Sequence, residues 1–183
     1  MGDEPWRKVS RYGDRVLRRV LSLIAAVALT ASLAACSDDS GGADAVDGSL
    51  FTAAFETFDG EQVTLADYRG TPVVVNFFAS WCTPCITEMP EFESVHQELG
   101  DRVAIIGLHY DDTREKGLEI VERTGVTYLV GRDVDGTLFR ATKGVAMPTT
   151  VFIRDDGTVA AVRSIALNAD KLRDAISKEL GVS

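Results

Sequence analysis

Runs of aliphatic and β-branched residues recur after residue 50 and predict buried strands. The most continuous run is TPVVVNFF, Thr71–Phe78, in which apolar residues do not alternate with polar ones. This pattern is typical of a strand that is covered on both faces. Two similar runs, RVAIIGLH at Arg102–His109 and VTYLVG at Val126–Gly131, predict a second and a third strand.

Between and after these runs the apolar residues follow the period of a helix. A helix is predicted over residues 84–99, where Gly100 would end it, and another over TREKGLEIVERTG, residues 113–125. A closing helix is expected after Asn168, whose side chain can cap its first turn. One apolar face of this helix is formed by Leu172, Ala175, Ile176 and Leu180.

Asp-Gly dipeptides join two pairs of extended segments and favour tight turns. Residues 50–68 predict an N-terminal hairpin about Asp59-Gly60, and residues 149–164 a second hairpin about Asp156-Gly157. A short irregular or helical piece is expected from Gly136 to Pro148. Strands that alternate with helices, closed by a hairpin and a helix, predict one α/β domain at residues 50–183, with a mixed central sheet flanked by helices.

The first 49 residues have a different character. Six basic residues between Arg7 and Arg19 precede the apolar segment Val20–Ala35, whose sixteen residues are fewer than the roughly 20 that span a bilayer. Such a pair of segments is typical of a secretory signal, of the Sec or twin-arginine type, with an uncleaved membrane anchor as the alternative. The small, acidic and aperiodic stretch Ser37–Ser49 predicts a flexible tether over residues 36–49.

The apolar segment ends in LAAC, Leu33–Cys36, which resembles the lipobox of bacterial lipoproteins. In those proteins the cysteine is lipidated and becomes the new N-terminus. The resemblance therefore implies a signal peptide at residues 1–35 and an extracytoplasmic protein held on the bacterial cell membrane by a lipid at Cys36. Ordinary cleavage nearby would leave Cys36 as a free thiol, which is a liability outside the cytoplasm.

The chain carries 19 basic and 28 acidic residues, a net charge of −9. Residues 1–35 hold six of the basic and three of the acidic residues, so the charge without them is −12. Bulk electrostatics of this sign do not favour nucleic acid or anionic lipid. Nucleic acid is therefore not expected as a partner, and membrane attachment would depend on lipid rather than on charge.

The stretch NFFASWCTPCITEMP, residues 76–90, places Cys82 and Cys85 two residues apart behind the first predicted strand. Structural zinc is disfavoured because it needs four ligands, and neither His96 nor His109 has ligand spacing to the pair. A purely structural disulfide is disfavoured because so small a loop constrains the unfolded chain little. Thiol–disulfide redox chemistry, without a metal or a cofactor, is the remaining interpretation.

Cys82 is expected to open the predicted helix, where unpaired N–H groups and the helix dipole favour a thiolate. Pro84 suits the first turn, because the N–H that proline lacks has no partner there. Cys82 is therefore predicted to attack a disulfide. Cys85, one turn further and more buried, is predicted to resolve the mixed disulfide.

Glu88 shares the inner stripe of this helix with apolar residues at Phe92, Val95 and Leu99. A carboxylate there would be partly desolvated, with a raised pKa, and could accept the proton of Cys85 directly or through a water. The alternative is a solvated glutamate that complements the helix dipole. Pro90 is expected to kink the helix at this level.

Together, VVVNFFASWCTPCITEMP, GVAMPTTVFI and the RDDGTV hairpin are similar to the thioredoxin superfamily. The similarity is closest to the membrane-tethered, extracytoplasmic thiol-disulfide oxidoreductases of the TlpA/ResA type, and runs from about Leu50 to the C-terminus. It implies a thioredoxin-like fold, a cis Pro148 against the cysteine pair, and Glu88 as the acidic residue of the catalytic helix. Trp81, Met147 and Thr149 are implied to contact the substrate.

The sequence departs from cytoplasmic thioredoxins at two positions. Asn76 stands where they have a buried aspartate, and Phe78 where tryptophan is common. Proton transfer is therefore expected to depend on Glu88. The resemblance also implies a protein that reduces disulfides in exported proteins, such as apocytochromes c, with electrons from a membrane thiol carrier of the CcdA/DsbD type. A monomer is expected.

Three other functions compete with this one. An oxidant that forms disulfides would use the same cysteines, but Thr83-Pro84 lacks the histidine of strongly oxidising relatives. A copper-handling metallochaperone would need a Cys-x-x-x-Cys spacing and a later histidine, and no histidine follows His109. A peroxiredoxin would need proline and threonine ahead of its cysteine, where this chain has Val75 or Asn76 and Ala79.

Overall fold

The structure, a computed structural model, describes residues 49–183, so the predicted signal peptide and most of the predicted tether lie outside the described residues. Within this range no helix is both long and apolar enough to cross a bilayer. The described helices are α2 (Ser49–Thr52), the 3₁₀ helix η2 (Leu65–Tyr68), α3 (Thr83–Leu99), α4 (Arg114–Thr124), α5 (Thr137–Ala141) and α6 (Ala169–Leu180). The described strands are β1 (Ala54–Thr57), β2 (Gln62–Thr64), β3 (Val73–Phe78), β4 (Ala104–Tyr110), β5 (Leu129–Asp133), β6 (Thr149–Ile153) and β7 (Val159–Arg163).

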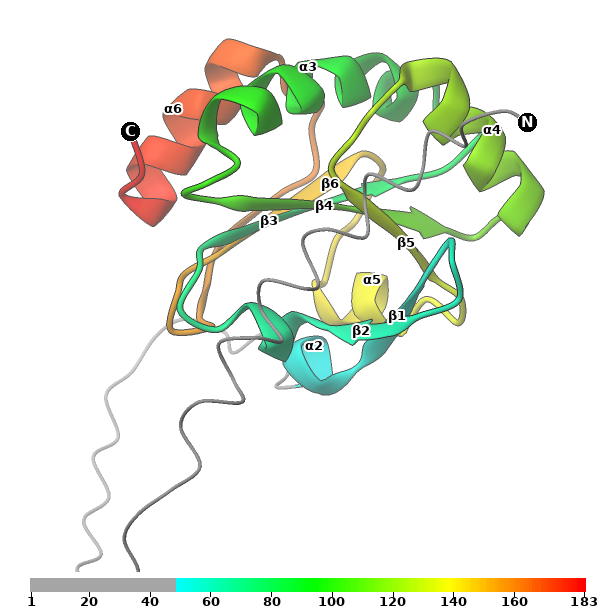
Figure 1. Ribbon diagram of the computed structural model, residues 1–183, viewed down its shortest axis with the longest axis horizontal. Coiled ribbons are helices and arrows are strands. Elements are labelled where there is room, and N and C mark those ends of the chain that lie inside the picture. The colour runs from blue at the N-terminus through cyan, green and yellow to red at the C-terminus, as the bar shows by residue number, and fades with distance from the viewer. Residues whose placement is uncertain (1–48) are drawn as a thin grey trace, which may run out of the picture. The chain divides into compact units, whose positions relative to one another are not determined.

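The strands of the described part form one mixed sheet in the order β2-β1-β5-β4-β3-β6-β7 (Figure 1). β3, β4 and β5 are parallel, whereas β6 pairs antiparallel with β3 and the N-terminal hairpin adds β1 antiparallel to β5. β3 therefore lies inside the sheet between β4 and β6. The predicted α/β fold, with a mixed central sheet and an N-terminal hairpin, is confirmed.

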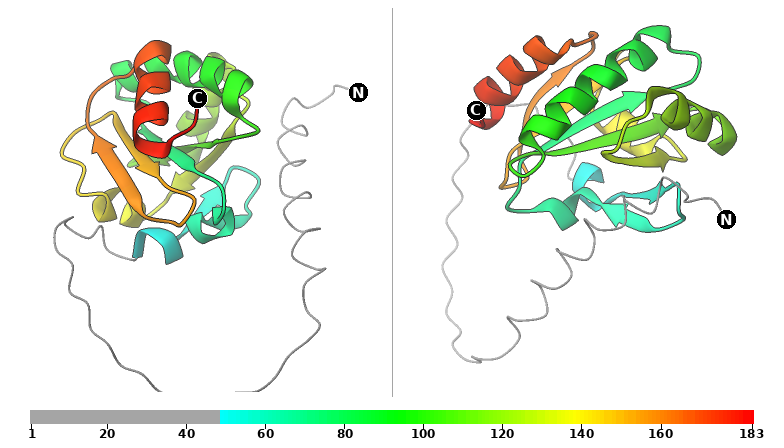
Figure 2. Two further views of the ribbon diagram at one scale, coloured as in Figure 1. Left: turned by 90° about the vertical axis from the view of Figure 1, so that its left-hand side faces the viewer. Right: turned by 45° about the horizontal axis from the view of Figure 1, so that its top comes forward.

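Helices cover both faces of this sheet (Figures 1 and 2). α3, α4 and α6 pack on one face over a first hydrophobic cluster, and α2, η2 and α5 pack on the other face over a second cluster. All six residues of β3 are buried because they alternate between the two clusters, which explains the unbroken apolar run in the sequence. Both hydrophobic clusters and every described strand pair lie within the compact unit Ala45–Ser183. This unit therefore contains the core and the complete described sheet, and we expect it to fold on its own.

Several predicted boundaries agree with the structure. α3 begins one residue before Pro84 and ends at Leu99. α4 ends at Gly125, whose positive φ of 67° is the left-handed conformation that glycine adopts without strain. The side chain of Asn168 caps α6 by accepting a hydrogen bond from the backbone N–H of Lys171 at 3.0 Å.

Three local expectations are wrong. Leu65–Tyr68, expected in the second extended segment of the N-terminal hairpin, form the 3₁₀ helix η2 after the short strand β2. Residues 50–52 were expected in an extended segment but form part of α2, and this helical turn places Leu50 in the second cluster, where it is 1% exposed. The third strand begins at Leu129 rather than Val126 and continues to Asp133. The ring of Tyr128 occupies the space above Gly107, with Cε2 lying 3.1 Å from the position of a Cβ there. Burial of this ring, rather than strand pairing, accounts for the apolar character just before β5.

Gly131 in β5 is a sensitive point of the packing. A Cβ at this position would lie 2.5 Å from Cδ2 of Phe55 and 3.0 Å from the carbonyl oxygen of Glu56. Phe55 is 1% exposed and cannot move aside without disturbing the second cluster. We expect Gly131→Ala to lower the free energy of unfolding by about 1–3 kcal/mol, measured by urea denaturation. An unchanged transition midpoint would contradict this packing argument.

Candidate active site

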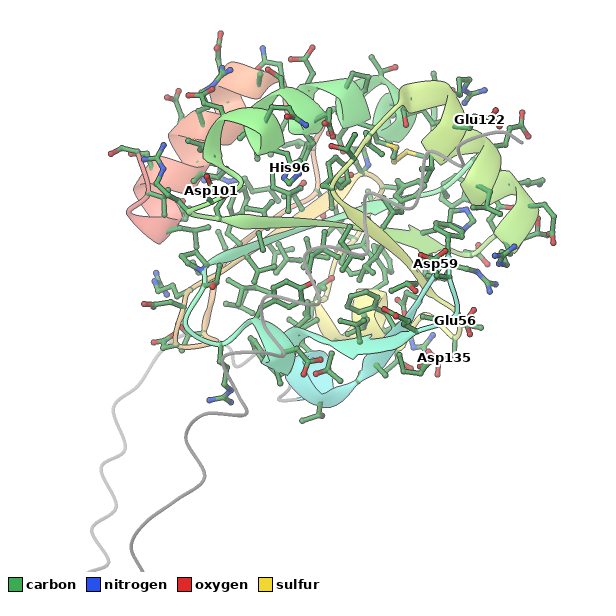
Figure 3. All side chains as sticks on the ribbon, in the orientation of Figure 1. Glu56, Asp59, His96, Asp101, Glu122 and Asp135 are labelled. Carbon is green, nitrogen blue, oxygen red and sulfur yellow. A yellow bond between two sulfur atoms is a disulfide. The ribbon has the colours of Figure 1, made fainter. Side chains whose placement is uncertain are left out.

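A disulfide joins Cys82 and Cys85 at the start of α3 and is visible as the yellow bond in Figure 3. Cys82 is the N-cap of the helix, and its Sγ accepts a hydrogen bond from the backbone N–H of Cys85 at 3.3 Å. Such a donor stabilises a thiolate when the pair is reduced. Cys82 is 4% exposed and Cys85 is fully buried, so a substrate can approach Cys82 but not Cys85.

Glu88 lies one turn beyond Cys85 on the inner side of α3 and is 3% exposed. Its Oε1 accepts a hydrogen bond from Nδ2 of Asn76 at 2.8 Å, and its Oε2 accepts one from the backbone N–H of Leu167 at 2.9 Å. Burial raises the pKa of Glu88 to about 7, although both hydrogen bonds act to lower it. Glu88 can therefore exchange a proton near neutral pH, one helical turn from Cys85.

The predicted inner stripe is thus confirmed, since the residues buried along α3 include Cys85, Glu88, Phe92, Val95 and Leu99. Asn76 is also fully buried, on β3 beneath this stripe. An amide does not titrate in the physiological range, so only Glu88 can change charge in the contact between these two side chains. This supports the expectation that proton transfer depends on residue 88 rather than on residue 76.

A groove of about 490 Å³ opens beside Glu88. One wall is formed by the first turns of α3, including Thr83 and Thr87, and the other by residues 166–168 and Lys171. Because the Glu88 side chain forms part of the lining, its proton has a route to solvent although the side chain is buried.

The peptide bond between Met147 and Pro148 is cis, as the TlpA/ResA resemblance implies. Pro148 is buried directly before β6, the strand that pairs with β3. The hydroxyl of Thr149 donates a hydrogen bond to the carbonyl oxygen of Ala146 at 2.5 Å and lies 2.9 Å from the hydroxyl of Ser164. Thr149 is fully buried, so its side chain orders this loop and is not available for the predicted substrate contact, whereas Met147 is half-buried.

Trp81 is 56% exposed beside Cys82, as a residue that contacts a substrate should be. Its indole N–H donates to the carbonyl oxygen of Asp111 at 3.4 Å, and the preceding Ser80 donates to the carboxylate of Asp112. Neither aspartate is among the site residues that the sequence predicts. Loops that follow neighbouring parallel strands meet at one edge of the sheet, so these contacts can be expected only once the strand order is known.

Within residues 49–183, no group of three or more His, Cys, Asp or Glu side chains is placed to hold a metal ion. His96, in the last turn of α3, packs its ring against that of Tyr128, with ring centroids 6.0 Å apart (Figure 3). His109 packs between the rings of Phe58 and Phe78 on β4. Cys36, the predicted lipidation site, lies outside the described residues.

Known proteins resemble the chain over the same region. Residues 43–162 match the AhpC/TSA family. The thiol-disulfide oxidoreductase ResA of Oceanobacillus iheyensis is 32% identical over 118 residues, which cover 64% of this chain and 62% of that protein. The thiol:disulfide interchange protein DsbE of Xylella fastidiosa is 35% identical over 108 residues, which cover 58% of this chain and 54% of that protein. The chain thus spans less than two thirds of the length of these relatives.

Solved structures share the fold. A secreted Mycobacterium tuberculosis disulfide oxidoreductase, homologous to E. coli DsbE, superimposes with a TM-score of 0.65 at 23% identity, covering 72% of this chain and 98% of that one. A putative protein disulfide isomerase from Bacteroides thetaiotaomicron gives a TM-score of 0.62 at 30% identity, covering 70% and 86%. The predicted thioredoxin-like fold is confirmed. Because the family match extends over more than half of its length, the chain belongs to the AhpC/TSA family, with ResA-type and DsbE-type oxidoreductases among its relatives.

Proposed function

We propose that this protein is an extracytoplasmic thiol-disulfide oxidoreductase that reduces disulfides in exported proteins, such as apocytochromes c. The observation that carries the proposal is the asymmetry of the Cys82–Cys85 pair. One cysteine caps a helix and keeps a small exposed area, and the other is fully buried one turn from a carboxylate whose pKa is about 7. This arrangement provides an attacking thiol, a resolving thiol and a group that can accept a proton.

In the reduced protein, the Cys82 thiolate attacks one sulfur of the substrate disulfide. A mixed disulfide forms and the first substrate thiolate leaves. Glu88 then takes the proton of Cys85, and the Cys85 thiolate attacks Sγ of Cys82. The second substrate thiolate leaves and the Cys82–Cys85 disulfide forms again, so two electrons pass to the substrate, whose thiolates are protonated from solvent.

The return to the reduced state needs an electron donor, for which we propose a membrane thiol carrier of the CcdA/DsbD type. The LAAC sequence supports lipidation at Cys36 after removal of residues 1–35, with residues 36–49 as the tether. The relatives named as oxidoreductases support the chemistry. Cis-Pro148, Trp81 and Met147 would form the surface that receives the substrate, and the protein would act as a monomer.

The reduction potential of the unit Ala45–Ser183, equilibrated with glutathione, tests the direction of electron flow. We expect a value near that of thioredoxin, about −270 mV, or lower, which would make the protein a reductant. A value near that of DsbA, about −120 mV, would make it an oxidant that forms disulfides in exported proteins. Stoichiometric retention of Cu(I) without activity on disulfides would favour copper handling, and rapid consumption of hydrogen peroxide would favour a peroxidase.

A further inference from the structure

The carboxylate of Asp112, in the loop between β4 and α4, binds the segment that leads into Cys82. Its Oδ2 accepts hydrogen bonds from the backbone N–H of Ser80, at 3.2 Å, and from the Ser80 hydroxyl. Its Oδ1 accepts a hydrogen bond from the backbone N–H of Thr113 at 2.9 Å and lies 3.3 Å from Nζ of Lys116. The side chain is only 4% exposed. A carboxylate that is this buried and accepts three hydrogen bonds is part of the folded structure rather than a mobile surface group.

The residue before Asp112 contacts Trp81, through its backbone carbonyl rather than its carboxylate. Asp111 has a positive φ of 53°, which is uncommon for a residue other than glycine, and its carbonyl oxygen accepts the indole N–H of Trp81 at 3.4 Å. β3 and β4 are parallel neighbours, with Phe78 opposite His109, so the loops that follow them lie side by side. Both residues that precede Cys82 are therefore fixed by one short loop.

Asp112 keeps its charge under physiological conditions. Burial acts to raise the pKa of its carboxyl, but the hydrogen bonds from Ser80 and Thr113 and the contact with Lys116 outweigh burial and lower the pKa to about 2. His109 also faces this carboxylate, with Nε2 at 3.8 Å from Oδ2, and burial lowers the pKa of His109. At neutral pH the carboxylate is thus a permanent acceptor for Ser80.

We propose, on the basis of the function proposed above, that Asp112 is a positioning residue for protein substrates. It holds Ser80 directly, and the adjacent Asp111 carbonyl holds Trp81, so that the exposed indole and Sγ of Cys82 form one rigid surface. A rigid aromatic side chain contributes contact area without the entropy cost of being ordered when a substrate binds. A small disulfide needs only the thiolate of Cys82 and makes no use of this surface.

Single-turnover reduction of two probes by the dithiol form of the unit Ala45–Ser183 tests the proposal. With insulin as the protein disulfide, we expect Asp112→Ala to lower the second-order rate constant by roughly 2- to 10-fold, the cost of ordering one side chain on binding. With 2,2′-dithiodipyridine, a small uncharged disulfide, the rate constant should stay within about twofold of the wild type. Trp81 is the only tryptophan in residues 45–183, so its fluorescence anisotropy should fall in the variant.

Two further variants separate positioning from general damage to the fold. Lys116→Met removes the ion pair of Asp112 but leaves both bonds to Ser80, and should keep wild-type rates with both probes. Ser80→Ala should slow insulin reduction less than Asp112→Ala, and should have no further effect when Asp112 is already alanine. An equal loss with both probes, or an unchanged rate with insulin, would overturn the inference. A wild-type protein that cannot reduce insulin at all would instead remove the proposed function.

Discussion

Replacing Cys82 by serine will abolish the reduction of protein disulfides, by at least about three orders of magnitude, because a neutral hydroxyl cannot replace the attacking thiolate. Replacing Cys85 by serine will also stop turnover, but at a later step. Cys82 can still attack, and without a resolving thiol the mixed disulfide with the substrate accumulates. The measurement is insulin reduction, with non-reducing gels and mass spectrometry of the products.

The two variants are matched controls for one another, since each removes one sulfur and neither can form the intramolecular disulfide. A stable adduct in Cys85→Ser and none in Cys82→Ser would establish the order of attack. The reverse pattern would contradict the roles that burial assigns to the two cysteines, because it would require a fully buried sulfur to meet the substrate first.

The stability of the oxidised protein should fall as the pH rises through neutrality, and Glu88 should be the cause. The pKa of Glu88 is about 7 in the folded protein against an ordinary value of 4.5. Between these values the folded protein keeps a proton that the unfolded chain releases, so the stabilisation is complete below about pH 4.5 and is lost as the pH rises through 7. A difference of this size corresponds to about 3 kcal/mol.

Urea denaturation of the wild type and of Glu88→Gln between pH 4 and pH 9 measures this effect. Glutamine can still accept from Asn76 but presents an amide, rather than an oxygen, to the N–H of Leu167, so the variant should be less stable at low pH. The free energy of unfolding of the wild type minus that of Glu88→Gln should fall by about 3 kcal/mol from low to high pH. Glu91→Gln removes a carboxylate that binds the first turn of α6, through the N–H of Ala169, and should follow the pH dependence of the wild type because Glu88 is still present. A constant gap between wild type and Glu88→Gln would contradict a raised pKa.

Features that depend on local periodicity could be predicted from the sequence. The buried strand β3, the extent of α3 and the inward position of Glu88 all follow from apolar residues at fixed spacing. The disulfide could also be foreseen, because two cysteines at this spacing near a helix start favour redox chemistry over other uses. The cis bond before Pro148 was foreseen only through the family resemblance, since X-Pro bonds are rarely cis in general.

Contacts between distant parts of the chain could not be predicted in this way. The backbone N–H of Leu167 reaches Glu88 across 79 positions, and no pattern near either residue indicates it. The buried side chain of Thr149 was expected to face the substrate, because its place after Pro148 says nothing of the hydroxyl partners that turn it inward. The contact of Ser80 with Asp112 likewise depends on the order of strands in the sheet, which local periodicity does not specify.

The position of α2 has a consequence for how the protein would sit in its surroundings. α2 packs beside η2 and α5 on one face of the sheet, whereas the cysteine pair lies with α3 on the opposite face (Figure 1). The chain therefore enters the domain at Ser49 on the side away from its thiols. With a lipid at Cys36, as proposed, the tether would join the domain on the face opposite the cysteine pair.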